Sequence, residues 1–256
     1  MEQVNTKGVK NLIAYGLSQK ALICQISTIS VGGLSDSENG VKEFSEENFY
    51  IGQRIDNQYI YSKYMAEYEL LRAAVDKGLG VKIMRVGNLQ GRSRDGEFQM
   101  NLKSNAFTRK LFSYMKMGAV PKTVYDASVN FSPVDETAHM ILALTKTDAN
   151  YSVFHVYPPE EVAFGSLFRI MEQQGHKIEV VSEEEFGTRF QELKQTKEGR
   201  SLVEGLLTDN LGGTSRENPV VQKMTNQLLD QLGEAWLPMT EEYLAKYLSA
   251  LEGLNM

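Results

Sequence analysis

The sequence predicts an α/β fold, with a parallel sheet in the first part of the chain and a smaller, mainly helical part after it. Three short apolar runs, 20–28, 81–86 and 151–159, have the composition of buried strands, since parallel strands are covered on both faces. A long amphipathic segment, 56–78, joins the first two runs. A helical crossover of this kind is what two parallel strands require.

The helices around these strands follow from periodicity and from capping residues. Apolar residues recur every three to four positions over 2–17, which predicts a helix there, and another helix is expected over about 101–117. Pro133 then breaks an extended segment, and Asp135 and Glu136 open another helix in the way that the helix dipole favours.

The pattern turns mainly helical from about residue 163 onward. We expect helices over 163–174, 182–195, 198–207, 218–232 and 240–252, and a short strand over 177–181. The chain therefore divides into an α/β part, residues 1–160, and a mainly helical part, residues 161–256.

Composition excludes several classes of function. The chain has 256 residues and a net charge of −6 without any basic run, which argues against a nucleic-acid surface. No apolar stretch is long enough to span a membrane, and the first residues lack the apolar core of a signal peptide, so a cytoplasmic protein is expected. Cys24, the single cysteine, lies in an apolar run and is expected to be buried. His139 and His155 lack partners at ligand spacing, so no metal site is expected.

The stretch QYIYSKYMAE, 58–67, places Tyr59 and Lys63 four residues apart at the start of the predicted helix. Residues at this spacing lie one turn apart on the same helix face. A phenol has a pKa near 10, and a nearby cation lowers it, so the pair can serve acid–base chemistry. By itself the same pair also fits two ordinary solvated residues.

Hydroxyl groups at the end of the first predicted strand favour the catalytic interpretation. Ser27 and Thr28 end the run KALICQIST, and open α/β sheets bind their ligands at the carboxyl ends of the strands. A reacting carbonyl oxygen there would have a second hydroxyl donor beside Tyr59, from Ser27 or from Thr28. The joint arrangement is much more specific than either motif alone.

At this point the sequence resembles the extended short-chain dehydrogenase/reductases. STISVGG is similar to the strand end that bears the catalytic Ser or Thr of that family, which places Thr28 there. Tyr59 and Lys63 match its catalytic tyrosine and lysine. The resemblance thus implies three catalytic residues, Thr28, Tyr59 and Lys63.

The same resemblance implies a nicotinamide cofactor. MRVGNLQGR is similar to the family segment after the next strand, which puts Val86, Gly87 and Asn88 beside the nicotinamide and the substrate. Ser27 is implied to contact the cofactor as well, together with Tyr59 and Lys63. No residue is implied as a metal ligand.

A narrower resemblance is to the thioester reductase domains of nonribosomal peptide synthetases and to related carboxylic acid reductases. The form YxxSKxxAE, with Glu67 at its end, is typical of that branch. The resemblance implies NADPH-dependent release of an acyl or peptidyl thioester, as an aldehyde or an alcohol, from the phosphopantetheine arm of a carrier protein. NADP is implied by the family alone, and NAD stays open. A larger synthetase would hold the domain.

One departure from the family pattern is large. The family begins with a strand and a turn of the form Gly-x-x-Gly-x-x-Gly, which cradles the cofactor pyrophosphate at a helix amino terminus. No such spacing follows a strand here. We therefore expect the carboxyl-terminal portion of a reductase domain with a partial Rossmann-type sheet, whose amino-terminal nucleotide-binding half lies upstream.

Two alternatives remain open from the sequence. One is another extended short-chain dehydrogenase/reductase, such as a sugar-nucleotide epimerase, a dehydratase or a ketone reductase. The other is a non-catalytic fragment that docks a carrier protein.

Overall fold

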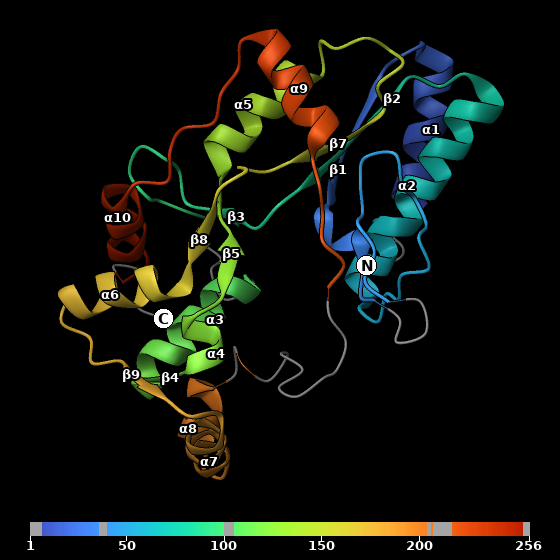
Figure 1. The fold of residues 1–256 in the computed structure, drawn as a ribbon. Helices are drawn as coiled ribbons and strands as arrows, with labels where there is room; N and C mark the ends of the chain where they lie inside the picture. The colour runs from blue at the N-terminus through green and yellow to red at the C-terminus, as the bar shows by residue number, and fades with distance from the viewer. Residues whose placement is uncertain (1–6, 36–39, 100–104, 204–205, 207–216, 253–256) are drawn as a thin grey trace. The chain divides into compact units, whose positions relative to one another are not determined.

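The computed structural model describes residues 7–35, 40–99, 105–203, 206 and 217–252 (Figure 1). The chain forms two compact units that interleave along the sequence. The first unit comprises residues 1–87, 137–157 and 214–236, and the second comprises residues 88–136, 158–213 and 237–256. The division into residues 1–160 and 161–256 stays a prediction about domains.

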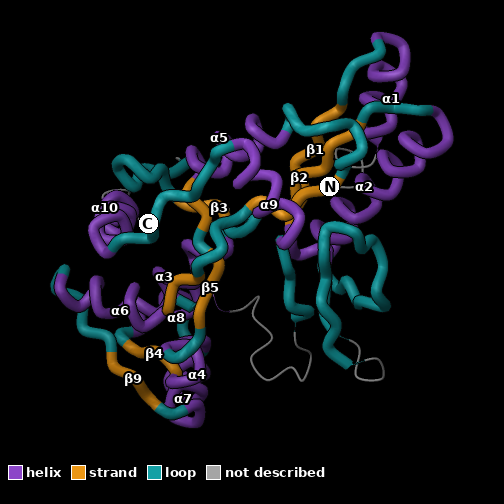
Figure 2. Tube along the Cα trace, turned by 45° about the horizontal axis from the view of Figure 1, so that its top comes forward, coloured by secondary structure: helices purple, strands orange, loops and turns teal. Residues whose placement is uncertain are grey.

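A parallel sheet forms the centre of the first unit. Its strands are β1 (Ile23–Thr28), β2 (Val81–Val86) and β7 (Val153–Val156), with β2 in the middle. Figure 2 shows β1 and β2 side by side, with the helices of the same unit around them. The three predicted strands and the α/β fold class are confirmed.

Two helices pack on each other and on this sheet. They are α1 (Gly8–Gln19) and α2 (Gln58–Lys77). The core between them and the strands consists of Val9, Ile13, Ile23, Ala66, Leu70, Ala73, Leu79, Val81 and Ile83. Helix α5 (Val134–Leu144) enters this unit at residue 137, and α9 (Lys223–Leu232) contacts β7.

The ends of α2 are set by its flanking residues. The Asn57 side chain accepts hydrogen bonds from the backbone N–H groups of Tyr59 and Ile60, which satisfies donors that a helix start leaves open. Gly78 ends the helix with a φ of 67°, a left-handed conformation that glycine adopts without strain. The helix predicted over 56–78 therefore has sharp limits.

The first strand is less buried than its apolar sequence predicts. Cys24 and Ile26 are exposed, although Ile23 and Ser27 on the other face are buried. Within the described residues, β1 lies at the edge of the sheet, and its face with Cys24 and Ile26 is open to solvent. The expectation of a buried Cys24 was wrong for this reason.

The helix predicted over 218–232 begins later than expected. Phe44 donates from its backbone N–H to Pro219, and Val221 donates back to Phe44, so this stretch is extended and paired. A backbone segment with these bonds cannot also form a helical turn, and α9 begins at Lys223.

The second unit combines small strand pairs with helices. Strand β3 (Leu89–Gln90) lies parallel to β6 (Ser132–Pro133), β4 (Ala119–Pro121) lies parallel to β9 (Glu179–Val181), and β5 (Ser128–Asn130) lies antiparallel to β8 (Glu161–Ala163). Its helices are α3 (Ala106–Met117), α4 (Lys122–Tyr125), α6 (Phe164–Gln173), α7 (Glu183–Lys194), α8 (Lys197–Leu202) and α10 (Glu241–Glu252). Most of these strands are too short to show alternation in a sequence. The parts of the predicted helices at 2–6, 101–104, 204–205 and 207 lie outside the described residues.

Aromatic side chains tie α10 to the segment around β3. Phe131 packs edge-on against Tyr243 and Tyr247, with ring centroids 5.9 and 5.0 Å away. The Tyr243 hydroxyl donates to the Gly91 carbonyl at 2.7 Å, and the Tyr247 hydroxyl donates to the Gln90 side-chain oxygen at 2.6 Å. Burial raises the pKa of both tyrosines, so both hydroxyls remain donors.

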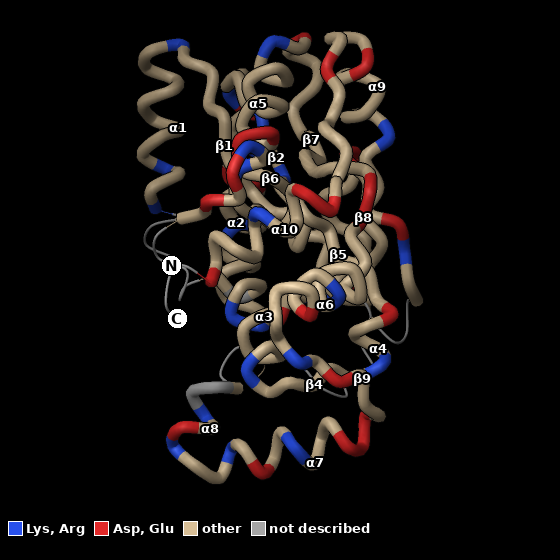
Figure 3. The backbone as a smooth tube through the Cα atoms, turned by 90° about the vertical axis from the view of Figure 1, so that its left-hand side faces the viewer, with Lys and Arg blue, Asp and Glu red and all other residues tan. Residues whose placement is uncertain are grey.

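Charged residues are spread over both units, and α7 carries both signs along its length (Figure 3). In the part of the chain that the structure describes, no helix is both long enough and apolar enough to cross a membrane.

Alanine substitutions at two glycines with positive φ allow the cost of backbone strain to be measured apart from the cost of steric overlap. Gly96 and Gly175 have φ angles of 73° and 99°. A Cβ added at Gly96 would lie 2.4 Å from the Tyr247 backbone nitrogen, whereas one added at Gly175 would have no atom within 4 Å. We expect Gly175→Ala to cost roughly 1–2 kcal/mol of stability from strain alone. Gly96→Ala should cost about 1–3 kcal/mol more because of overlap. Urea unfolding followed by circular dichroism measures both, and equal losses would refute the close approach of α10.

Candidate active site

Helix α2 brings Tyr59 and Lys63 to the carboxyl edge of the sheet. The helix contacts β1 and the short 3-10 helix, Ile29–Gly32, that follows β1. The Lys63 Nζ donates to the Ile26 carbonyl at 3.0 Å, two residues before the strand ends at Thr28. The Tyr59 side chain is 44% exposed. Lys63, one turn from Tyr59, therefore lies against the last residues of β1 in the first unit.

The electrostatics of the pair differ from the sequence expectation. Burial raises the pKa of the Tyr59 phenol, and burial also lowers the pKa of Lys63, with Glu67 acting in the opposite direction. The Lys63 Nζ lies 5.8 Å from the Tyr59 ring centroid and is bonded to Ile26. Burial thus raises the pKa of Tyr59, and the lowering expected from the lysine is not found.

Thr28 lies at the strand end with a hydroxyl suited to donate. Its Oγ1 accepts a hydrogen bond from the Ser30 backbone N–H at 3.2 Å and so caps the 3-10 helix. A hydroxyl has one donor and two acceptor sites, and this bond uses only an acceptor. The O–H of Thr28 can still donate to a carbonyl oxygen.

Ser27 and Thr28 point to opposite faces of β1, as neighbouring strand residues do. Ser27 is 3% exposed, and its hydroxyl donates to the buried Glu67 carboxylate. The structure therefore brings Ser27 into the interior between α2 and the sheet. Because the Ser27 hydroxyl is buried and bonded to Glu67, it does not face a ligand at the sheet edge.

The residues predicted beside the nicotinamide follow β2. Val86 pairs with Thr28 on one side and Val156 on the other. Gly87 donates from its N–H to the Val156 carbonyl. Asn88 is the first residue of the second unit, where its N–H donates to the Asn130 side chain at 3.0 Å.

A buried charged network lies under this edge, and sequence reasoning missed it. Glu67 and Arg85 are both 0% exposed, and Arg85 Nη2 lies 2.8 Å from a Glu67 oxygen. Ser27, Arg85 and His155 are partners in register across β1, β2 and β7, so they form one row on one sheet face. The clue in the sequence was an arginine inside the apolar run VKIMRV and a glutamate on the buried side of α2.

His155 ends the row as a neutral imidazole. Burial and the Arg85 charge lower its pKa to about 3. Its Nδ1 lies 2.6 Å from the Val221 carbonyl, and its Nε2 lies 3.1 Å from Arg85 Nη1. A carbonyl only accepts, so Nδ1 carries the hydrogen and Nε2 accepts from Arg85. Phe44 covers both groups, with its ring stacked on His155 and beneath the Arg85 guanidinium.

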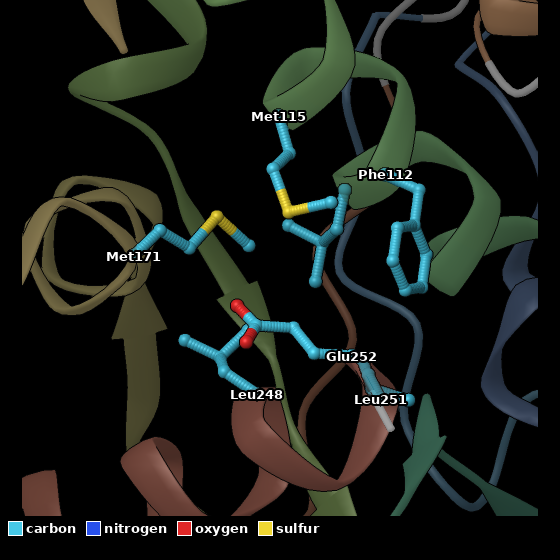
Figure 4. Close-up of a pocket in the computed structure, with 7 residues that line it drawn as sticks. Phe112, Met115, Met171, Leu248, Leu251 and Glu252 are labelled. Carbon is cyan, nitrogen blue, oxygen red and sulfur yellow. The ribbon is translucent and has the colours of Figure 1, made fainter. Parts of the chain in front are cut away.

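Other parts of the described chain offer less chemistry. No group of three His, Cys, Asp or Glu side chains in these ranges could hold a metal ion. A hollow of about 10 Å³ in the second unit has room for about one water. Figure 4 shows Met115 and Met171 pointing into it, with Leu248, Leu251 and Glu252 of α10 beside them.

Known proteins similar to this chain are reductases and synthetase components. Residues 1–141 match the sequence model of an NAD-binding family described as male sterility protein. A component of the linear gramicidin synthase of Brevibacillus parabrevis is 26% identical over 97% of this chain and 5% of its own length.

Solved structures share the fold over the whole sequence. A thiolation-reductase di-domain from an archaeal nonribosomal peptide synthetase is 32% identical, with a TM-score of 0.90, and covers 100% of this chain. A reductase domain from the aureusimine biosynthetic cluster is 26% identical, with a TM-score of 0.86 over 99% of the chain. The chain spans 54% of the first structure and 66% of the second.

The neutral state of His155 predicts a pH dependence of stability. The unfolded histidine has a pKa near 6.5, so below that pH the unfolded chain gains a proton that the folded chain, with its value of about 3, does not. The free energy of unfolding therefore decreases as the pH falls below about 6.5, by up to about 1.4 kcal/mol per pH unit. His155→Gln keeps an acceptor for Arg85 and removes this titration.

Urea unfolding at a series of pH values from about 7 to about 4 measures the slope. We expect a shallower fall of the unfolding free energy in His155→Gln than in the wild type. His139→Gln, which changes an exposed histidine of the same unit, is the control and should keep the steeper slope. Parallel curves for His155→Gln and the wild type would mean that His155 is not buried in neutral form.

Proposed function

Because the chain belongs to the NAD-binding family described as male sterility protein, we propose that it carries the catalytic residues of an NADPH-dependent thioester reductase. The enzyme releases an acyl or peptidyl group from a carrier protein as an aldehyde. The single observation that supports this most is the arrangement at the carboxyl edge of the sheet. There Lys63, one turn from Tyr59, is bonded to β1 two residues before Thr28.

The similar proteins support this substrate class. The archaeal di-domain joins a thiolation domain to a reductase, and another relative is a component of the linear gramicidin synthase. A thiolation domain holds its acyl group as a thioester. On this basis the partner is a carrier protein with a phosphopantetheine-bound substrate, and the reductase acts as part of a larger synthetase in the cytoplasm.

The residues at the edge fit the nicotinamide end of the cofactor. Lys63 is half-buried with its ammonium at the strand end, where it can hold ribose hydroxyls in place of the Ile26 carbonyl. Ser27, Val86, Gly87 and Asn88 belong to the same proposed binding region, Ser27 through its backbone. The bound cofactor supplies a hydride to the thioester carbonyl carbon. NADP rather than NAD is proposed from the family resemblance.

Tyr59 supplies the proton in the proposed reaction, and Thr28 assists it with a hydrogen bond. Tyr59, a phenol whose ordinary pKa lies near 10 and is raised further by burial, is protonated at neutral pH, which is the state needed to donate a proton to the carbonyl oxygen during reduction. Thr28 donates a second hydrogen bond to the same oxygen as negative charge develops there. The carbon–sulfur bond then breaks. One hydride and one proton enter, and an aldehyde and a free thiol leave.

Residues 161–256 are proposed to shape the acyl pocket and to meet the carrier.

Tyr59→Phe tests the proton donor. In the protein as its gene encodes it, with NADPH and an acyl-carrier thioester, we expect aldehyde release to fall by about 10²–10⁴-fold, because the general acid is lost. Tyr61→Phe removes the hydroxyl of an exposed tyrosine on the same helix and should leave the rate unchanged. A protein that turns over a nucleotide sugar and no thioester would refute the proposed substrate class.

Thr28 gives a matched pair of variants. Thr28→Val keeps the shape of the side chain and removes the hydroxyl, and we expect kcat to fall by about 10²–10³-fold. Thr28→Ser keeps both the hydroxyl and the cap of the 3-10 helix and should retain most of the activity. Similar rates for the valine and serine variants would show that the hydroxyl does not reach the reacting oxygen.

A further inference from the structure

We infer that Glu67 is a positioning residue, whose buried carboxylate sets the height and rotation of α2 so that Tyr59 and Lys63 meet the Thr28 end of β1. This inference rests on the proposed function for its catalytic consequence. That Glu67 fixes α2 on the sheet is inferred from its contacts with Ser27 and Arg85 alone.

Spacing along α2 connects the buried carboxylate to the exposed phenol. Tyr59, Lys63 and Glu67 follow at intervals of four, so they lie along one stripe of the helix. Eight residues span about 12 Å along a helix axis. Glu67 lies at the level of Ser27 and Arg85 inside the sheet, Lys63 reaches the Ile26 carbonyl, and Tyr59 lies one turn further toward the start of α2. Any axial slip of Glu67 is therefore transmitted to the phenol.

The carboxylate is held from two strands at once. The Ser27 hydroxyl of β1 donates to one Glu67 oxygen. The Arg85 guanidinium of β2 donates from Nη2 at 2.8 Å and from Nε at 3.1 Å to the other oxygen, and its Nε also lies 3.2 Å from the first. Planar, bidentate contacts of this kind fix direction as well as distance. Apolar packing of Ala66 and Leu70 on the same helix has no such directional preference.

The guanidinium is itself fixed on its other side. Its Nη1 donates to the Asn48 carbonyl at 3.0 Å and to His155 Nε2 at 3.1 Å. Val221 holds the far nitrogen of that imidazole. The carboxylate thus docks on a preset arginine, and α2 follows the carboxylate.

The test replaces the ion pair by two amides. Glu67→Gln alone would leave Arg85 as an unpaired buried charge, so the variant of choice is the double change Glu67→Gln with Arg85→Gln, which buries no charge. Hydrogen–deuterium exchange with mass spectrometry is then measured on the protein without ligand. We expect exchange in residues 58–67 to rise by about tenfold or more, because α2 is no longer locked to the strands. Exchange in α3, in the other unit, should stay unchanged.

Lys82→Gln is the matched control in the same strand. Lys82 is 2% exposed and donates to Thr147, Asp148 and Tyr151, so the change also removes a buried charge from β2, at the other end of the strand. It should leave exchange in residues 58–67 unchanged. If the double variant does not fold, Ser27→Ala removes only the link to β1 and should raise exchange in residues 23–28 and 58–67. Unchanged exchange in the double variant, or in Ser27→Ala where that variant is needed, overturns the inference.

Activity separates this inference from the proposed function. In the protein as its gene encodes it, the double variant should lower kcat for thioester reduction by about a hundredfold, as small misplacements of reacting groups do, with little change in the KM for the thioester. A wild type that reduces no thioester sinks the proposed function but leaves the exchange result standing. An active wild type with a double variant of unchanged kcat sinks the positioning role.

Discussion

The ion pair between Glu67 and Arg85 is the contact on which the first unit most depends. Both side chains are fully buried, and removal of either partner would leave an uncompensated charge at a cost of about 3–5 kcal/mol. The pair joins the crossover helix to the central strand, and Ser27 and His155 extend it across the whole sheet. Where Glu67 lies therefore determines where Tyr59 and Lys63 lie.

One face of the sheet has two different chemical halves. Near the amino ends of the strands, Ile23 and Ile83 pack against the apolar side of α2, while near the carboxyl ends Ser27, Arg85 and His155 form the polar row. The apolar half buries most of the side of α2 that packs on the sheet, and the hydrogen bonds of the polar half fix the orientation of the helix. The arrangement explains how one helix can be buried along one side and still present a phenol and an amine at a ligand-binding edge.

Much of this could be predicted from the sequence, for identifiable physical reasons. Strands and crossover helices are long enough to show their periodicity, and Tyr59 and Lys63 lie one helical turn apart as their spacing predicts. The catalytic roles of Tyr59, Lys63 and Thr28 rest on the family resemblance and stay a proposal. The sequence could not show that Ser27 turns inward to Glu67, because the partners lie forty residues apart. It also could not show that burial raises the pKa of Tyr59, nor that Phe44 pairs with the backbone of 219–221, so that α9 begins later than predicted.

The central claim is that the edge around Tyr59 reduces a carrier-bound thioester by hydride transfer from a nicotinamide. The most direct measurement supplies the protein, as its gene encodes it, with an acyl-carrier thioester and NADPH deuterated at the transferring position of the nicotinamide. We expect an aldehyde that carries the deuterium on its carbonyl carbon, together with a free carrier thiol. Release of a free acid, or of an aldehyde without deuterium, would contradict this claim.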